Sequence, residues 1–69
     1  MIDARGRSCP EPVIMIKNAM NTKEDCYTMM VDNRTSLENV TRFSEHNGYE
    51  VSYETNDEDE YTLTIKKIK

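Results

Sequence analysis

The sequence feature that most constrains the fold is the order of two hydrophobic patterns along the chain. One repeats at every second residue, and the other repeats every three or four residues. Apolar and polar residues alternate in three segments, Ile2–Arg5, Tyr49–Glu54 and Tyr61–Lys66, as they do in strands with one face toward water. A fourth segment, Tyr27–Val31, has apolar residues on both faces, which predicts a more buried strand. Between them, two segments carry apolar residues three or four positions apart, which is typical of amphipathic helices. The predicted order is therefore strand, helix, strand, helix, strand, strand.

This order predicts an α/β (α+β) two-layer sandwich. A strand–helix–strand unit strongly prefers parallel strands and a right-handed crossover, and two such crossovers can place both helices on one face of the sheet. The last two strands, joined by the polar run Asn56–Glu60, should form a hairpin. We therefore expect a four-stranded mixed sheet with two helices on one face, as a single domain over residues 1–69. Cys9 and the turn at Asp32–Thr35 both follow the carboxyl ends of parallel strands, so they should share one edge of the sheet.

The second helix has the clearest boundaries. Thr35 and Glu38 match a capping box, so Thr35 is the expected N-cap. Asn47 and Gly48 supply the left-handed stop expected after a helix. The side chains expected to face the core are Leu37, Val40 and Ser44.

The first helix carries Val13, Ile16 and Met20 on one stripe, which we expect to pack on the core. Ile14 and Met15 fall outside this stripe. We therefore expect part of this helix to expose apolar surface.

The chain enters the first helix through an unusual segment, in which Cys9 is followed by Pro10 and Pro12. Proline favours the first turn of a helix and biases the residue before it toward an extended conformation. Gly6 is expected to turn the chain out of the first strand, so Gly6 and the two prolines form a structural motif around Cys9. The helix could begin at Pro10 or at Pro12. A cysteine at the positive end of a helix dipole has a lowered pKa and a reactive thiolate, which makes Cys9 the catalytic candidate.

Composition excludes several other functions. The net charge of −4 argues against sequence-independent nucleic-acid binding, which requires many basic residues. Two cysteines and one histidine suit neither a disulfide scaffold nor a zinc site, so we expect no metal and no cofactor. The sequence shows no membrane-length apolar run and no signal-peptide pattern, so the expected location is cytoplasmic.

The segment Asp3–Lys17, which reads D-x-R-G-x-x-C-P-E-P-x-x-x-x-K, resembles the signature of the TusA (SirA-like) family of small sulfur carriers. The segments 31–33, 38–43 and 48–51 are similar to the N-terminal domain of YedF-like proteins, a branch associated with selenium metabolism. The resemblance implies the same two-layer sandwich, with the last strand antiparallel in a mixed sheet.

The resemblance also implies a function. In this family the cysteine of the Cys-Pro-x-Pro motif, here Cys9, carries sulfur as a persulfide received from a cysteine desulfurase or another sulfur-carrier protein. The chain would then act as a sulfurtransferase-type carrier of sulfur or selenium. YedF-like proteins continue into a DsrE-like domain, whereas this chain ends after its last strand, so a DsrE-like domain or protein is a candidate partner.

The charged residues near Cys9 have alternative roles. Arg5 and Arg7 could hold the persulfide or dock an acidic partner, or they could be solvated loop charges. Asp3 is expected to brace the turn through Asx-type hydrogen bonds. Glu11 is expected to be structural or a partner contact. Lys17 should lay its stem along apolar surface, with partner recognition as a secondary role.

Two further features complete the predictions. Cys26 is expected to be structural, because it should lie at the amino end of its strand, at the sheet edge opposite Cys9. The alternative function is a non-catalytic protein-interaction or regulatory module, supported by the apolar side chains of Ile14 and Met15 outside the core stripe.

Overall fold

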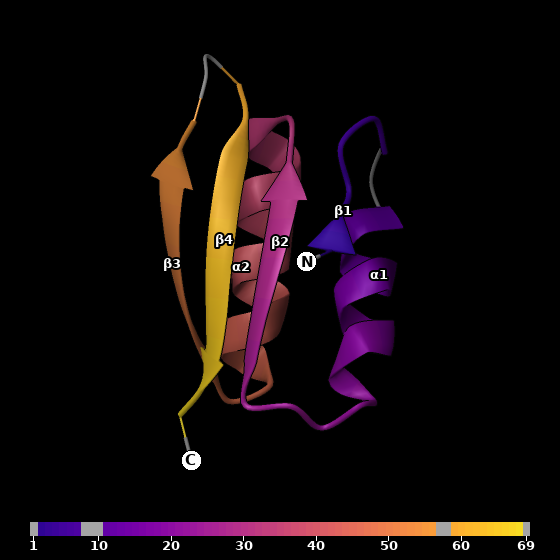
Figure 1. Ribbon diagram of the computed structural model, residues 1–69, viewed down its shortest axis with the longest axis vertical. Helices are drawn as coiled ribbons and strands as arrows, with labels where there is room; N and C mark the ends of the chain where they lie inside the picture. The colour runs from indigo at the N-terminus through magenta and orange to yellow at the C-terminus, as the bar shows by residue number, and fades with distance from the viewer. Residues whose placement is uncertain (1, 8–10, 57–58, 69) are drawn as a thin grey trace.

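The computed structural model describes residues 2–7, 11–56 and 59–68, and it contains one four-stranded sheet covered on one face by two helices (Figure 1). In spatial order the strands are β1 (Ile2–Asp3), β2 (Cys26–Val31), β4 (Tyr61–Lys67) and β3 (Tyr49–Thr55). The helices are α1 (Glu11–Met20) and α2 (Arg34–His46). The predicted fold and order of elements are confirmed. Within the described ranges, neither helix has the length and apolar character needed to cross a membrane.

The sheet is mixed, as expected. β1 pairs in parallel with β2, while β4 is antiparallel to both of its neighbours. β4 therefore lies between β2 and β3, and the β3–β4 hairpin is confirmed. This arrangement brings the amino end of β4 beside the carboxyl end of β2, because Val31 is opposite Tyr61.

The core lies between the sheet and the two helices. Alternate residues of β2 and β4 face it, and the residues between them lie on the opposite face of the sheet. Ile16, Val40 and the side chains of both central strands exclude water from this layer. The buried residues of the two central strands are Tyr27, Met29, Val31, Tyr61, Leu63 and Ile65, and Tyr49 of β3 is buried with them.

The start of α2 differs from the prediction. Asn33, in an extended conformation, is the N-cap, and its side-chain oxygen accepts a hydrogen bond from the Ser36 N–H at 2.7 Å. Thr35 is exposed in the first turn, so its assignment as the cap is wrong. Asn33 is itself a favoured cap residue, and a cap at this position lets the helix begin at Arg34. The predicted stop is confirmed at Gly48, with a φ of 83°.

The described part of α1 begins at Glu11, between the two predicted starts. Pro12 is buried in the first turn, and Ile16 is buried as predicted. Met15, expected outside the packed stripe, is partly buried against the core. The reason is that α1 contacts α2 as well as the sheet, so its packed surface is wider than one stripe. Ile14 remains 45% exposed, as expected.

Candidate functional site

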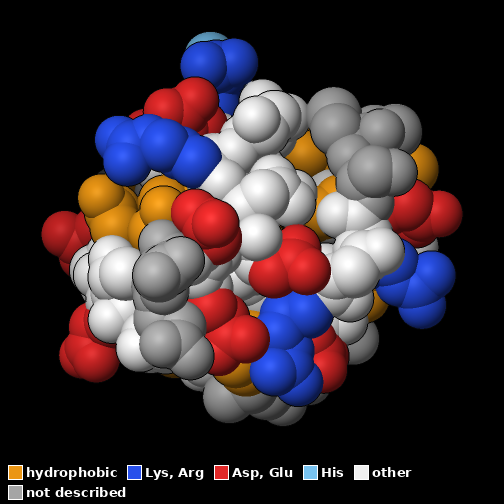
Figure 2. All heavy atoms as spheres, turned by 90° about the horizontal axis from the view of Figure 1, so that it is seen from above, with side chains coloured by type: hydrophobic (Ala, Val, Ile, Leu, Met, Phe, Trp, Pro, Cys, Tyr) orange, Lys and Arg blue, Asp and Glu red, His pale blue; other side chains and the backbone are white. Residues whose placement is uncertain are grey.

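The loop after β1 and the turn after β2 meet at one edge of the sheet. Gly6, with a φ of 78°, donates its backbone N–H to Asp32 Oδ2 at 2.7 Å. Asp32 directly follows β2, so this bond joins the carboxyl ends of the two parallel strands. The predicted common edge is therefore confirmed for the described part of the loop. Figure 2 looks onto this end of the molecule and shows acidic and basic side chains close together on it.

Arg5 is held by two carboxylates at this edge. Its guanidinium contacts both oxygens of Asp3, with Nε to Oδ1 and Nη2 to Oδ2 each at 3.0 Å. Nη1 donates to Glu60 Oε2 at 3.2 Å. The charge of Arg5 is thus matched within the fold, which reduces its capacity to bind an additional anion.

Asp3 braces the turn as predicted. Its Oδ1 accepts the Arg5 backbone N–H at 3.1 Å, which is an Asx-type hydrogen bond. The hydrogen bonds from Arg5 lower the pKa of Asp3 from 3.8 to about 2. The same contacts raise the pKa of Arg5, so both groups are charged at neutral pH.

The other charged candidates are exposed to solvent. Arg7, Glu11 and Lys17 form no ion pair with any residue of the described ranges. The backbone N–H of Arg7 donates to the Ala4 carbonyl at 3.2 Å. These three side chains are available to a partner, and the cations Arg7 and Lys17 also to an anion, whereas Arg5 is already engaged.

Cys9 and Pro10 lie outside the described residues, as does Ser8. Along the chain, Cys9 is three residues after the Gly6 turn and two residues before the first described residue of α1. Glu11 is an anion in the first turn of α1, where it interacts favourably with the helix dipole. Pro12 has no N–H, so it removes one of the donors that a helix start normally offers.

The described residues at this edge include no histidine. His46 is in the last turn of α2, at the opposite end of that helix from Asn33 and Asp32. In the part of the chain that the structure describes, no group of three or more His, Cys, Asp and Glu side chains could hold a metal ion. The site thus offers a loop held by Asp32, a neutralised Arg5, and the exposed charges of Arg7 and Glu11 around the entry to α1. Lys17 lies in the last turn of α1, away from this entry.

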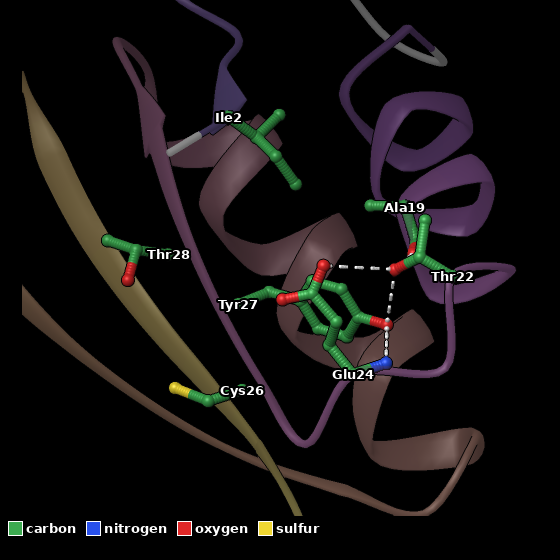
Figure 3. A pocket seen from close by; sticks show the side chains of 7 residues that line it. All are labelled: Ile2, Ala19, Thr22, Glu24, Cys26, Tyr27 and Thr28. Carbon is green, nitrogen blue, oxygen red and sulfur yellow. Dashed lines mark hydrogen bonds between the residues drawn. The ribbon is translucent and has the colours of Figure 1, made fainter.

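Cys26 lies far from this edge, at the amino end of β2, as predicted. It is an exposed free thiol beside a hollow of about 380 Å³. Figure 3 shows its side chain on the opposite side of the strand from Tyr27, whose hydroxyl accepts the Glu24 N–H at 2.9 Å. The hollow is lined by Ile2, Ala19, Thr22, Glu24, Cys26, Tyr27 and Thr28.

Sequence reasoning assigned no site role to Asp32 or Glu60. Asp32 was expected at this edge as part of the turn after β2, and its place level with the Gly6 turn was a usable signal for the hydrogen bond that it accepts. Glu60 was interpreted as part of a solvated loop. Its contact with Arg5 spans 55 positions in the sequence and depends on the order of strands in the sheet.

Comparisons with known proteins agree on one family. The profile of the family described as "Sulfurtransferase TusA" matches residues 1–67. The "Putative sulfur carrier protein MJ0990" of Methanocaldococcus jannaschii is 35% identical over 68 residues, which cover 96% of this chain and 91% of that protein. The crystal structure of a SirA-like protein from Desulfitobacterium hafniense superimposes with a TM-score of 0.83 at 37% identity. That match covers 94% of this chain and 92% of the other.

Proposed function

Because this chain belongs to the sulfurtransferase TusA family, we propose that it is a sulfur carrier that accepts sulfur on Cys9 and relays it to a partner protein. The observation that carries the proposal is the Cys9-Pro10-Glu11-Pro12 sequence at the entry to α1, in a chain that matches the family over residues 1–67. A relative and a solved structure of similar length, named a putative sulfur carrier and a SirA-like protein, support it.

The reaction is two thiol exchanges. The Cys9 thiolate attacks the outer sulfur of a persulfide on the donor, the donor's S–S bond breaks, and the donor cysteine leaves as a thiolate. Cys9 then carries the transferred sulfur as its own persulfide. In the second step a thiolate of the acceptor attacks that sulfur, and Cys9 is released as a thiolate. The sulfur is transferred between cysteines without an external oxidant or reductant.

The described surroundings suit this exchange. The Gly6–Asp32 bond fixes the loop that leads to Cys9, and the engagement of Arg5 by Asp3 and Glu60 limits the positive charge that could trap an anion. Arg7 remains as an exposed cation three positions earlier in the sequence than Pro10. A carrier needs this balance, because it must accept sulfur and also release it.

The donor in this proposal is a cysteine desulfurase or another sulfur-carrier protein, and a DsrE-like protein or domain is a candidate acceptor. Arg7, Glu11 and Lys17 are the exposed charges that such partners would contact. In this proposal the donor and acceptor proteins supply any general acid or base, because no histidine of the described chain lies at this edge.

Intact-mass analysis tests the proposal directly. The chain is incubated with a cysteine desulfurase and cysteine, and a mass gain of one sulfur atom, removable by a reductant, is expected. Cys9→Ser should abolish the gain, whereas the matched variant Cys26→Ser should retain it. Loading of the Cys9→Ser protein to the same extent as the unmodified protein would refute the assignment.

Selenium is the alternative cargo, suggested by the similarity of residues 31–33, 38–43 and 48–51 to YedF-like proteins. Selenium can follow the same exchange chemistry on a cysteine. Supplying a selenocysteine-cleaving lyase with selenocysteine would give a distinct mass gain on Cys9. Preferential loading from one donor system identifies the cargo.

A non-catalytic interaction module is the second candidate, favoured by Ile14, which is 45% exposed on α1. Such a module would retain its biological activity after Cys9→Ser but lose it after Ile14→Asp. A carrier would lose its activity after Cys9→Ser. Complementation of a deletion strain with the two variants separates these functions.

A further inference from the structure

The outer edge of β3 is a long unpaired strand. In the order β1-β2-β4-β3, β3 is terminal, and no strand of the described chain lies beyond it. It runs for seven residues, whereas β1 at the other edge is only two residues long. Figure 1 shows β3 at the side of the sheet away from β1 and α1. An open edge of this length is a template for pairing with another chain.

The hydrogen bonds that flank β3 show which of its backbone groups face outward. The Asn56 N–H donates to the Glu60 carbonyl at 2.8 Å, and the Ile68 N–H donates to the Gly48 carbonyl at 3.1 Å. In an antiparallel ladder such bonded pairs recur at every second residue. The even-numbered residues between Gly48 and Asn56 therefore bond to β4, and the odd-numbered ones direct their N–H and C=O groups to the open edge. The outward residues are Tyr49, Val51, Tyr53 and Thr55.

On the helix side, a groove follows this edge. A hollow of about 300 Å³ lies between α2 and β3, with Leu37 and the half-exposed ring of Tyr53 as its apolar surface. Charged side chains of α2 border it, and two of them, Arg34 and Glu38, pair with each other at 3.3 Å. Figure 2 shows hydrophobic atoms exposed on the β3 side of the molecule, next to basic and acidic side chains. Aliphatic side chains of an added strand, opposite Val51 and Tyr53, would cover this groove.

On the other side of the sheet, the edge is acidic. Glu50, Ser52 and Glu54 alternate along it and are all exposed. Within the sheet Glu50 is opposite Lys66, so a basic residue is already its neighbour on one side. Directly opposite positions in paired strands interact, and opposite charges there are favourable. An added strand should therefore present basic side chains on this face.

A second copy of this chain fits the edge poorly. Antiparallel pairing of two β3 strands centred on Ser52, which joins their full lengths, would place each Glu50 opposite the Glu54 of the other copy. Like charges at opposite positions destabilise a strand pair. The net charge of −4 adds to this repulsion.

We propose that the open edge of β3 binds an extended segment of a partner protein in which Lys or Arg residues alternate with aliphatic residues. The segment adds a fifth strand to the sheet, with its aliphatic side chains over the α2–β3 groove and its basic side chains beside Glu50 and Glu54. Because β3 and β1 lie at opposite edges, a partner held here leaves the loop after β1 accessible. The proposal does not depend on the sulfur chemistry of Cys9.

The test uses the full chain and a capped peptide of about nine residues in which Lys alternates with Val, long enough to span β3 at ~3.3 Å per residue. Nuclear magnetic resonance follows binding and amide hydrogen exchange. The amides of Val51, Tyr53 and Thr55 should become protected, while those of Ser52 and Glu54, already bonded to β4, should change little. Protection elsewhere, or no binding at millimolar peptide, would overturn the proposal.

Charge reversal provides the matched control. Glu54→Lys should weaken binding of the Lys–Val peptide by about two- to tenfold, because an attractive pair becomes a repulsive one. A Glu–Val peptide should bind this variant better than it binds the unmodified chain. Glu54 is exposed and lies opposite Thr62, and an unchanged thermal midpoint would show that the variant is folded. Equal affinity of both peptides for both proteins would contradict the proposal, as would self-association of the chain through the same amides.

Discussion

Asp32 holds the loop after β1 through a charged hydrogen bond to the Gly6 N–H. Asp32→Ala should lower the free energy of unfolding by about 1 kcal/mol, since hydrogen bonds to charged groups contribute at the upper end of the usual range and this one is partly solvated. The loop that leads to Cys9 should also become more mobile, so sulfur loading should slow. Urea unfolding and the time course of the mass gain measure the two effects.

Asp25→Ala is the control for that substitution, because Asp25 is an exposed carboxylate that flanks the other end of β2. It should change neither stability nor loading. If the two alanine variants behaved alike, the bond to Gly6 would have no role in the proposed site.

The Asp3–Arg5 pair makes a pH-dependent contribution. Because its pKa is lowered to about 2, Asp3 stabilises the fold above pH ~4 and loses this contribution as the pH falls toward 2. The side chains are exposed, so the stability effect is small and the pKa is the better quantity to measure. Arg5→Gln should return the pKa of Asp3 toward its ordinary value in a carboxyl-carbon titration by nuclear magnetic resonance.

Arg7→Gln is the comparison, since Arg7 has the smallest of the effects that lower the pKa of Asp3. In this variant the pKa of Asp3 should stay close to its value in the unmodified chain. If the pKa of Asp3 did not change after Arg5→Gln, the bidentate contact would not persist in solution.

Among the elements, α2 allows a direct test of its start. Asn33→Ala removes the acceptor of the Ser36 N–H and should cost about 1 kcal/mol of unfolding free energy. Thr35→Ala, at the position that the sequence pattern favoured, should be nearly neutral because Thr35 is exposed and inside the helix. Thermal or urea unfolding of both variants measures the difference. A larger loss for Thr35→Ala would restore the capping box.

The helices and strands were predictable where the hydrophobic periodicity is strong. The residues at which they begin and end were harder to predict. Gly48 stops α2 as expected because a positive φ strongly favours glycine. At the N-terminus of α2, the capping-box pattern favoured Thr35, whereas the structure caps the helix with Asn33, two residues earlier. In α1, the single stripe underestimated the packed surface, since Met15 also packs against the core and the helix contacts α2 as well as the sheet.

For the whole molecule, the sequence predicted the layers and the common edge of the two loops, but not the order of strands. The hairpin could return on either side of β3, and its actual return places β4 beside β2. Glu60 reaches Arg5 only because of this order. The candidate site was therefore predictable where it depends on neighbours in sequence, such as Asp3 and Gly6, and not where it depends on the assembled sheet.

Stability of the whole domain should depend on a few fully buried side chains. A chain of 69 residues has an expected unfolding free energy of about 3–10 kcal/mol. Ile16 of α1 is fully buried in the core. Truncation of such a residue to alanine lowers the free energy of unfolding by about 2–5 kcal/mol. Ile16→Ala should therefore lower the thermal midpoint by at least ~10 °C or unfold the chain.

Ile14→Ala, the same substitution two positions earlier on α1, should change the midpoint by only a few degrees, because Ile14 is 45% exposed. The pair separates loss of packing from the helix propensity of alanine, which affects both variants equally. Calorimetry or circular dichroism on both proteins provides the measurement. Equal losses would mean that α1 packs in solution through a different face, whereas a large loss at Ile16 alone establishes the two-layer core as the main source of stability.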